Sequence, residues 1–299
     1  MNVQRVDEAF AAAVLPHRPA ETHKGDYGRA LLICGSVGYT GAARLAAESC
    51  VRAGAGLVGL LVPRSVYPIA AASCCPEVMC RPLPEDAEGR LSAQALPEIR
   101  ARMRGAHALL VGPGLGRSDA LDALVAALVA ECPAPLVADA DGLNALAGHI
   151  LERTAPLVLT PHEGEFRRLG GDLAEGRAAA ARRMAERRRA VVVLKGHRTV
   201  TASPDGRLYG NGTGGPGMAK GGSGDALAGL LTGLLAQRAA RPDLWRADEA
   251  EVAAAAVYLH GRAGDLAAAA RGVYGMTPSD MVARVPEAIA EVLRVKREV

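Results

Sequence analysis

The chain is patterned as short, continuously apolar runs that alternate with longer amphipathic stretches. Runs in which no polar residue alternates with the apolar ones are typical of strands that helices cover on both faces. The stretches between them place apolar residues three and four positions apart, which is the spacing of a helix with one buried side. The alternation therefore predicts βα units and a three-layer α/β/α sandwich around a mostly parallel central sheet.

The predicted elements follow one another without a long break. We expect strands at residues 30–34, 57–62, 108–111, 136–138, 157–159 and 191–194. We expect helices at residues 41–53, 119–131, 175–189, 223–235, 247–266 and 278–295. The turn Pro204-Asp205-Gly206 between TVTAS and RLYG predicts a hairpin. The polar stretch 82–89 is short and predicts a surface loop, so residues 1–299 are expected to form a single domain with residues 1–22 as an N-terminal helical extension.

Composition and charge exclude several classes of protein. Hydrophobic residues make up 49% of the chain and charged residues 22%, which is typical of a soluble globular protein. No apolar run approaches the roughly 18 residues of a membrane span, and the start of the chain, interrupted by Asp7 and Glu8, does not resemble a signal peptide. The net charge of +3 and the interrupted basic run 182–189 indicate a solvated helix face. We expect neither a nucleic-acid nor a membrane partner.

The six cysteines form no CxxC pair and have no histidine at zinc spacing. This spacing argues against a cysteine-ligated metal site. We expect reduced core thiols in a cytoplasmic protein.

The richest chemical signal is the segment GNGTGGPGMAKGGSGD, residues 210–225, which runs directly into the apolar helix pattern ALAGLLTGLLA. Its eight glycines let the backbone adopt positive φ and turn N–H groups toward an anion. A helix that opens there adds its N-terminal dipole, so phosphate is the expected ligand. A carboxylate beside phosphate needs a role, and we interpret Asp225 as a general base. The alternative is that Asp225 only caps the helix.

Other polar segments also stand at predicted strand ends, which meet at one edge of a parallel sheet. Gly35 to Gly41 and the segment VGPGLG, residues 111–116, are either ligand loops or tight turns. The segment DADGLN, residues 139–144, could hold magnesium through water, fix ribose hydroxyls, or cap a helix. His162 and Glu165 lack a third ligand nearby for a metal. Lys195 to Thr199 either bind phosphate or ribose, or form a basic turn.

Taken together, these segments resemble a known family, the ADP- or ATP-dependent NAD(P)H-hydrate dehydratases, which are carbohydrate-kinase-like members of the ribokinase-like superfamily. The resemblance runs over residues 23–265 and rests on HKGDYGRALLICGS, TGAARLAAESCVRAGAGLV, VGPGLG, DADGLNAL, LTPHEGEF, VVLKGHRTV, GNGTGGPGMAKGGSGDALAG and AVYLHGRAGD. It implies a ribokinase-like fold and an ADP-dependent hydro-lyase that repairs NADHX and NADPHX. Relatives often carry an additional epimerase domain, and because about twenty residues precede the first motif, we expect that activity to be absent.

The resemblance also implies roles for single residues. The nucleotide-binding residues would be Lys195, Gly196, His197, Arg198, Thr199 and Gly224. The residues that bind the hydrate would be Ala42, Gly114, His162 and Asp225, with Ala43 as an alternative to Ala42. The loop that holds phosphate would contain Lys220, Gly221, Gly222 and Ser223. ADP or ATP with Mg²⁺ would be the cofactors, no metal ligand is assigned, and a homo-oligomer is expected, with a tetramer as one option.

Two other functions remain open from the sequence. A small-molecule kinase of the same superfamily, acting with ATP on a sugar or a hydroxymethyl heterocycle, shares a glycine loop that ends in Gly-Asp. LTPHEGEF and GNGTGGPGMAKGG resemble the dehydratase branch instead. A non-catalytic nucleotide sensor could use the same pocket, but the presence of Asp225 argues against it.

Overall fold

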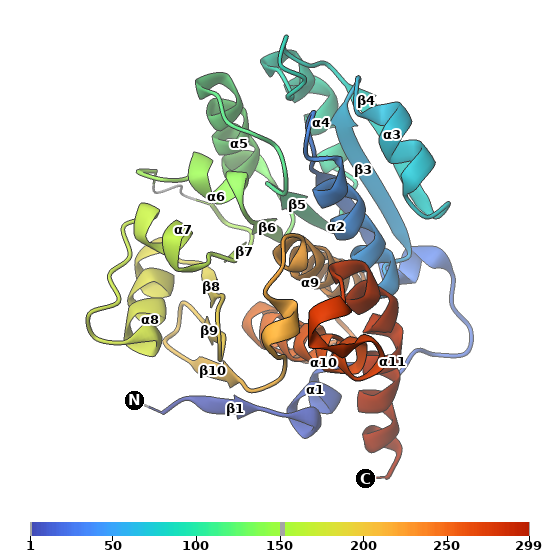
Figure 1. Cartoon of the computed structure of the whole chain (residues 1–299), viewed down its shortest axis with the longest axis vertical. Coiled ribbons are helices and arrows are strands. Elements are labelled where there is room, and N and C mark those ends of the chain that lie inside the picture. Colours follow the sequence, from blue (N-terminus) through green and yellow to red (C-terminus); the bar gives the residue numbers. More distant parts are fainter. Residues whose placement is uncertain (1, 150–152, 299) are drawn as a thin grey trace.

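The computed structural model describes residues 2–149 and 153–298. Within these ranges ten strands form one sheet, in the order β1-β10-β9-β8-β7-β6-β5-β2-β3-β4. Among the described strands only β9 runs opposite to its neighbours, pairing antiparallel with β8 and β10. The remaining pairs are parallel. The predicted mostly parallel sheet is confirmed (Figure 1).

The strands are short, and those at the centre of the sheet are fully buried. Their bounds are β1 Gln4–Val6, β2 Arg29–Ile33, β3 Leu57–Pro63, β4 Val78–Leu83, β5 Ala108–Val111, β6 Leu136–Ala138, β7 Leu157–Leu159, β8 Val191–Leu194, β9 Val200–Ala202 and β10 Leu208–Asn211. Successive residues of β2 alternate between the two apolar clusters, since Leu32 packs on one side and Ile33 on the other. A strand placed between two helical layers has no polar face, which explains the continuous apolar runs.

Two helical layers cover the sheet (Figure 1). One contains α1 Glu8–Val14, α2 Thr40–Arg52, α9 Ser223–Ala240, α10 Glu249–Gly275 and α11 Pro278–Glu298, with α3 Tyr67–Ser73 packed near β4. The other contains α4 Leu96–Met103, α5 Asp119–Glu131, α6 Asp141–Ala145, α7 Glu163–Arg168 and α8 Arg177–Arg188. Short 3-10 turns lie at η1 Lys24–Tyr27, η2 Ala93–Ala95 and η3 Pro216–Met218.

Helix α9 is the central element of its layer. It is buried almost all round, from Ala226 to Gln237, because α2 and α10 pack against it as well as the sheet. Small residues allow this: a Cβ atom on Gly229 would lie 2.0 Å from the carbonyl oxygen of Ala46 in α2. The close packing of α2 and α9 fixes the position of α9 on the sheet. The first turn of α9 then lies at the carboxyl ends of the strands.

The predicted strands are confirmed within one residue, as is the hairpin, which forms β9 and β10 around residues 204–206. Two strands were missed. Strand β4 lies at the edge of the sheet, carries the exposed Arg81, and contains Pro82. Edge strands tolerate proline and polar residues, so β4 extends into the stretch that we predicted as a loop. Strand β1, three residues paired with β10, precedes α1 inside the predicted helical extension.

The thiols fit the interpretation as reduced core residues. All six cysteines are free: Cys34, Cys50 and Cys132 are buried, and the other three are half-buried. In the part of the chain that the structure describes, no helix has both the length and the apolarity needed to cross a membrane.

Candidate active site

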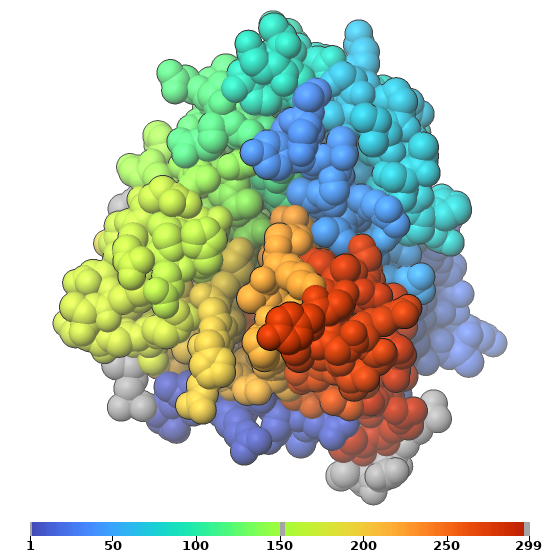
Figure 2. Space-filling model, in the orientation of Figure 1, coloured from blue at the N-terminus to red at the C-terminus, as the bar shows by residue number. Residues whose placement is uncertain are grey.

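Five strand-end segments and the start of α9 meet at one edge of the sheet. The segments follow β2, β5, β6, β7 and β8. Figure 2 shows this face of the molecule, with a hollow between the yellow-green segment of α7, the orange glycine-rich loop and the blue segment before α2. In open α/β sheets ligands bind in such a crevice beyond the carboxyl ends of the strands. The polar segments that we singled out in the sequence are therefore brought to one place.

The glycine-rich loop leads into α9 through a left-handed residue. Gly222 has φ +100° and is the N-cap of α9, and a Cβ atom there would lie 2.5 Å from Leu45 Cδ1. Helix α9 begins at Ser223, so Asp225 is its third residue and not its N-cap. The alternative that Asp225 serves as the N-cap of this helix is wrong.

The loop and the first turn of α9 are attached to α10 by polar contacts. His260 Nε2 lies 2.9 Å from the carbonyl oxygen of Ser223. The hydroxyl of Thr213 donates to the carbonyl of Tyr258 at 2.9 Å, and the Gly214 N–H donates to Asp265 at 3.1 Å. Burial lowers the pKa of His260 to about 4, so the imidazole is neutral near pH 7. These contacts explain why AVYLHGRAGD accompanies the glycine loop.

Two side chains of the predicted phosphate loop contact main-chain carbonyls. The exposed Lys220 donates its ammonium group to the carbonyls of Tyr274 and Met276 at the end of α10. The Ser223 hydroxyl donates to the carbonyl of Met218 at 2.6 Å. These contacts hold the loop in shape, and the assignment of the loop to phosphate stays a prediction.

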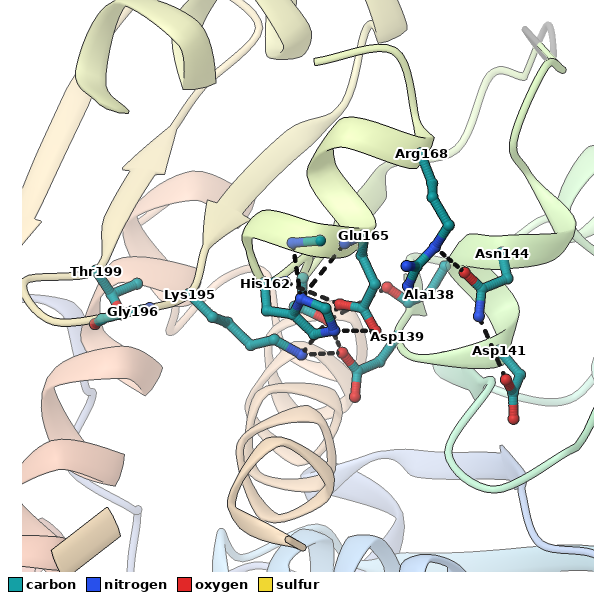
Figure 3. Close-up of polar contacts among 12 residues, drawn as sticks. Ala138, Asp139, Asp141, Asn144, His162, Glu165, Arg168, Lys195, Gly196 and Thr199 are labelled. Atoms are coloured by element: carbon teal, nitrogen blue, oxygen red, sulfur yellow. Dashed lines mark hydrogen bonds and ion pairs between the residues drawn. The ribbon is translucent and has the colours of Figure 1, made fainter. Parts of the chain in front are cut away.

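Lys195 lies in a different environment, between carboxylates from neighbouring strand ends (Figure 3). Its Nζ donates to Asp139 Oδ1 at 2.6 Å and lies 3.8 Å from Glu165 Oε2. The Thr160 hydroxyl donates to the same Asp139 oxygen at 2.7 Å. Burial alone would lower the pKa of Lys195, but Asp139 and Glu165 raise it above its ordinary value. The ammonium group is therefore charged at neutral pH.

His162 begins α7 as its N-cap. Its Nδ1 accepts the N–H of Gly164 at 2.9 Å, while the Glu165 carboxylate accepts the N–H of His162 at 2.8 Å. This reciprocal capping box orients both side chains. His162 Nε2 lies 3.4 Å from Glu165 Oε1, and 55% of the histidine side chain is exposed. The ring therefore has both a structural role in α7 and an accessible side at the crevice.

Asp225 has an unusual electrostatic environment. Burial raises the pKa of its carboxyl, Asp139 raises it further, and the cation of Lys195 opposes them, so the pKa is about 6. The charged or titratable groups that act on it or face it stand just after β2, β6 and β8 or in α6 and α7. They are Cys34, Asp139, Lys195, Asp141 and Glu165. A carboxylate with a pKa near 6 accepts a proton more readily than an ordinary one and is still ionised at pH 7.

The predicted hydrate-binding residues Ala42 and Gly114 are adjacent. Gly114 has φ +65°, and a Cβ atom there would lie 3.0 Å from the Ala42 Cβ and 2.8 Å from the Tyr39 Cβ. Ala42 is half-buried, whereas Ala43 is fully buried. The position next to Gly114 favours Ala42 over Ala43 as the residue that borders the crevice.

The predicted nucleotide segment forms a tight turn between β8 and β9. The Thr199 hydroxyl donates to the carbonyl of Gly196 at 3.0 Å, and Arg198 has φ +58°. His197 and Arg198 are exposed. Arg177 of α8 stabilises the turn by donating hydrogen bonds to the carbonyls of Leu194 and Lys195. The structure places Lys195 on the inside of the crevice and the rest of the segment at its rim.

Three residues at the site were not assigned from the sequence. Asp139 follows a strand directly, but DADGLN offered several roles and no means of choosing among them. Thr160 and His260 lie in the segments LTPHEGEF and AVYLHGRAGD but carried no signal of their own, because a hydroxyl at a strand end and a single histidine in an apolar helix are usually structural. Among the described residues, no group of three or more His, Cys, Asp or Glu side chains could hold a metal ion.

Comparisons with known proteins identify the family of this chain. The family model for NAD(P)H-hydrate dehydratases matches residues 30–287. A bifunctional NAD(P)H-hydrate repair enzyme from Moorella thermoacetica is 44% identical over 292 residues, which is 95% of this chain and 53% of that protein. An ADP-dependent (S)-NAD(P)H-hydrate dehydratase from Bacillus subtilis is 36% identical over 89% of this chain and 90% of that protein.

A solved structure extends the likeness to the whole fold. The B. subtilis ADP/ATP-dependent NAD(P)H-hydrate dehydratase, co-crystallised with ATP/Mg²⁺, has a TM-score of 0.82 at 31% identity and covers 98% of this chain and 99% of that one. The chain spans about half the length of curated relatives such as the M. thermoacetica protein. With a matching family model over most of its length and these relatives, the chain belongs to the NAD(P)H-hydrate dehydratase family.

Proposed function

We propose that this chain is an ADP-dependent (S)-NAD(P)H-hydrate dehydratase that converts NADHX and NADPHX to NADH and NADPH while ADP becomes AMP and phosphate. The observation that carries the proposal is the carboxyl of Asp225, partly buried in the first turn of α9 with its pKa raised to about 6. It lies beside a glycine-rich loop on one side and the Lys195 cation on the other. This combination suits the removal of a hydroxyl proton next to a phosphoryl group.

The proposed chemistry proceeds in two steps. Asp225 takes the proton of the hydroxyl on C6 of the nicotinamide ring, and that oxygen attacks the terminal phosphorus of ADP, so that AMP leaves. The ring nitrogen then pushes the phosphate ester out with its lone pair, and loss of a proton from C5 restores the double bond. The hydroxyl oxygen ends in inorganic phosphate, which balances the loss of water.

The residues around Asp225 would divide the binding between two ligands. Lys195 to Thr199 and Gly224 would hold the adenine nucleotide, and the backbone of residues 220–223 would bind its phosphates. Ala42, Gly114 and His162 would border the hydrate. Lys195 supplies a fixed positive charge, which stabilises the charge that develops during phosphoryl transfer.

Magnesium fits this site only as a companion of the nucleotide. The described residues contain no cluster that could hold a metal by themselves, and Mg²⁺ commonly keeps several waters and binds substrate phosphates. When bound there it would neutralise phosphate charge, and we assign it no protein ligand. The proposal also includes action in the cytoplasm, consistent with six free thiols, and a homo-oligomeric state.

The test is to incubate the protein with hydrated NADH and ADP and to follow the return of absorbance at 340 nm together with phosphate release. We expect both signals to rise in equal amounts. A small-molecule kinase would restore no absorbance, and a nucleotide sensor would release no phosphate. Absence of both signals with ADP and with ATP would refute the proposed function.

A further inference from the structure

Asp139 is less exposed than the charged side chains that it lies among, Lys195 and Glu165, although no ligand contact was assigned to it. Its side chain is 1% exposed, and that of Lys195 is 17% exposed. Oδ1 of Asp139 accepts both the Lys195 ammonium at 2.6 Å and the Thr160 hydroxyl at 2.7 Å. Figure 3 shows the long Lys195 side chain reaching across to this carboxylate. Three neighbouring strand ends, those of β6, β7 and β8, thus meet at one oxygen atom.

Backbone hydrogen bonds and close backbone packing fix the position of Asp139. Its N–H donates to the carbonyl of Val111, and its carbonyl accepts the N–H of Gly142 at 2.9 Å. A Cβ atom on Gly112 would lie 1.7 Å from that carbonyl oxygen. The next residue, Ala140, has φ +48° and ψ −118°, which is costly for a residue with a side chain. Strain of this kind persists only where the surrounding structure enforces it, and it gathers at functional sites.

The fixed ammonium group faces the start of α9. A Cβ atom on Gly224 would lie 3.3 Å from Lys195 Nζ and 3.8 Å from Asp139 Oδ2. Any side chain at position 224 would therefore enter the space beside the ion pair. This space adjoins Asp225 and the predicted phosphate loop, so Lys195 is directed toward the place where phosphate is expected.

We propose that Asp139 is a positioning residue. It holds the Lys195 ammonium against the first turn of α9, where the ammonium can contact a phosphate bound there. The inference rests on the proposed function for the identity of the nucleotide. A buried ion pair that serves stability alone is the competing explanation, but such pairs contribute little net stability relative to apolar packing. The convergence of three strand ends and the strain at Ala140 instead indicate that the pair serves the geometry of the site.

A double-mutant cycle tests the proposal directly. The variants are Asp139→Asn, Lys195→Met and the double variant, each measured for kcat, for KM of ADP and for the Kd of ADP by calorimetry. If Asp139 acts through Lys195, Asp139→Asn alone lowers kcat by roughly 10- to 100-fold, because a cation displaced by about 1 Å loses much of its effect. In the Lys195→Met background the same change then causes little further loss.

A merely structural role predicts a different pattern. The loss in Asp139→Asn would then appear in the melting temperature and not in the kcat of the folded protein, and that result would overturn the proposal. Thr160→Val, which removes one hydrogen bond to Asp139 and keeps the shape of the side chain, should lower kcat by a few fold while the protein stays fully folded at the assay temperature. Unchanged kcat in both Thr160→Val and Asp139→Asn would also overturn it. Asp122→Asn, at a half-buried aspartate of α5 that pairs with Arg117, is the matched control.

The two proposals can fail separately. If the wild-type chain shows no dehydratase activity, the proposed function fails, and the inference is then judged by the four Kd values for ADP alone. A non-additive cycle in ADP affinity supports the role of Asp139 in either case. Additive affinity losses refute it in either case. Loss of folding in Asp139→Asn, seen as a lost cooperative melt, would count for the structural role.

Discussion

The candidate site has two halves that are built differently. At the ends of β6, β7 and β8 it consists of charged side chains: Lys195 is held by Asp139 and lies close to Glu165. Before α9 it consists of backbone: the loop is rich in glycine, and its one lysine, Lys220, points its ammonium group at the carbonyls of residues 274 and 276. Asp225 lies where the two halves meet.

This difference shows that position in the fold decides what a lysine can do. Both lysines stand in segments that we predicted to bind the nucleotide or its phosphates. Lys195 is half-buried and oriented by the carboxylate of Asp139, which follows another strand, so its charge is fixed before any ligand arrives. Lys220 is exposed, and its contacts hold the loop to the end of α10. The first half supplies charge, and the second supplies shape.

The largest effect should come from Asp225, where the halves meet. Asp225→Asn removes the proposed base and leaves the loop and Lys195 in place, so we expect turnover to fall by about 10³-fold and the Kd for ADP to change little. Turnover is measured by the return of absorbance at 340 nm, and Kd by calorimetry. A variant that kept most of its rate would remove Asp225 from the role of base.

The next effect distinguishes the two lysines. Lys195→Met removes a fixed charge from the crevice and leaves Asp139 unpaired, so we expect the Kd for ADP to rise by roughly 100-fold. Lys220→Met should raise it by roughly three- to fivefold, through a loosened loop, because screened surface charges contribute little. Calorimetry with ADP measures both. Equal losses would show that the two halves bind phosphate in the same way.

Much of this arrangement could be predicted from the sequence. The central strands were predictable because strands buried on both faces appear in the sequence as continuous apolar runs such as VVVL. The loop before Asp225 was predictable because it contains many glycines. The edge strand β4 and the short β1 were not, because their residues are polar or few and pairing with β3 and β10 defines them. The role of Asp139 depends on its contact with Lys195, which lies 56 residues away in the chain, and the sequence does not show that contact.

A smaller effect tests whether the loop half depends on backbone shape. Gly222→Ala forces a side chain onto a residue with φ +100° and to within 2.5 Å of Leu45, so we expect a loss of roughly 2–3 kcal/mol in the free energy of unfolding. Gly221→Ala is the matched control, since a Cβ atom there meets no atom within 4 Å. It should stay within about 0.5 kcal/mol of wild type. Urea unfolding measures both.

The smallest effect concerns the cost of keeping Asp225 partly buried. Its folded pKa of about 6 exceeds the ordinary 3.8, so the folded state binds this proton more tightly than the unfolded state does. Ionisation therefore destabilises the fold: the cost is absent below pH 3.8, grows between pH 3.8 and about 6, and is complete above that.

The shift in pKa corresponds to about 3 kcal/mol. Because the half-buried carboxyl keeps contact with solvent, we expect Asp225→Asn to stabilise the protein by about 1–2 kcal/mol at pH 8. The gain should vanish as the pH falls toward 4, where the wild-type carboxyl is protonated in the folded state. Urea unfolding of both proteins at several pH values measures this difference. A gain that does not depend on pH would mean that Asp225 is not destabilised by its charge, and that the neighbouring Lys195 cancels the repulsion of Asp139. The two halves of the site would then be balanced in charge at the point where they meet, with the proposed base no stronger than an ordinary aspartate.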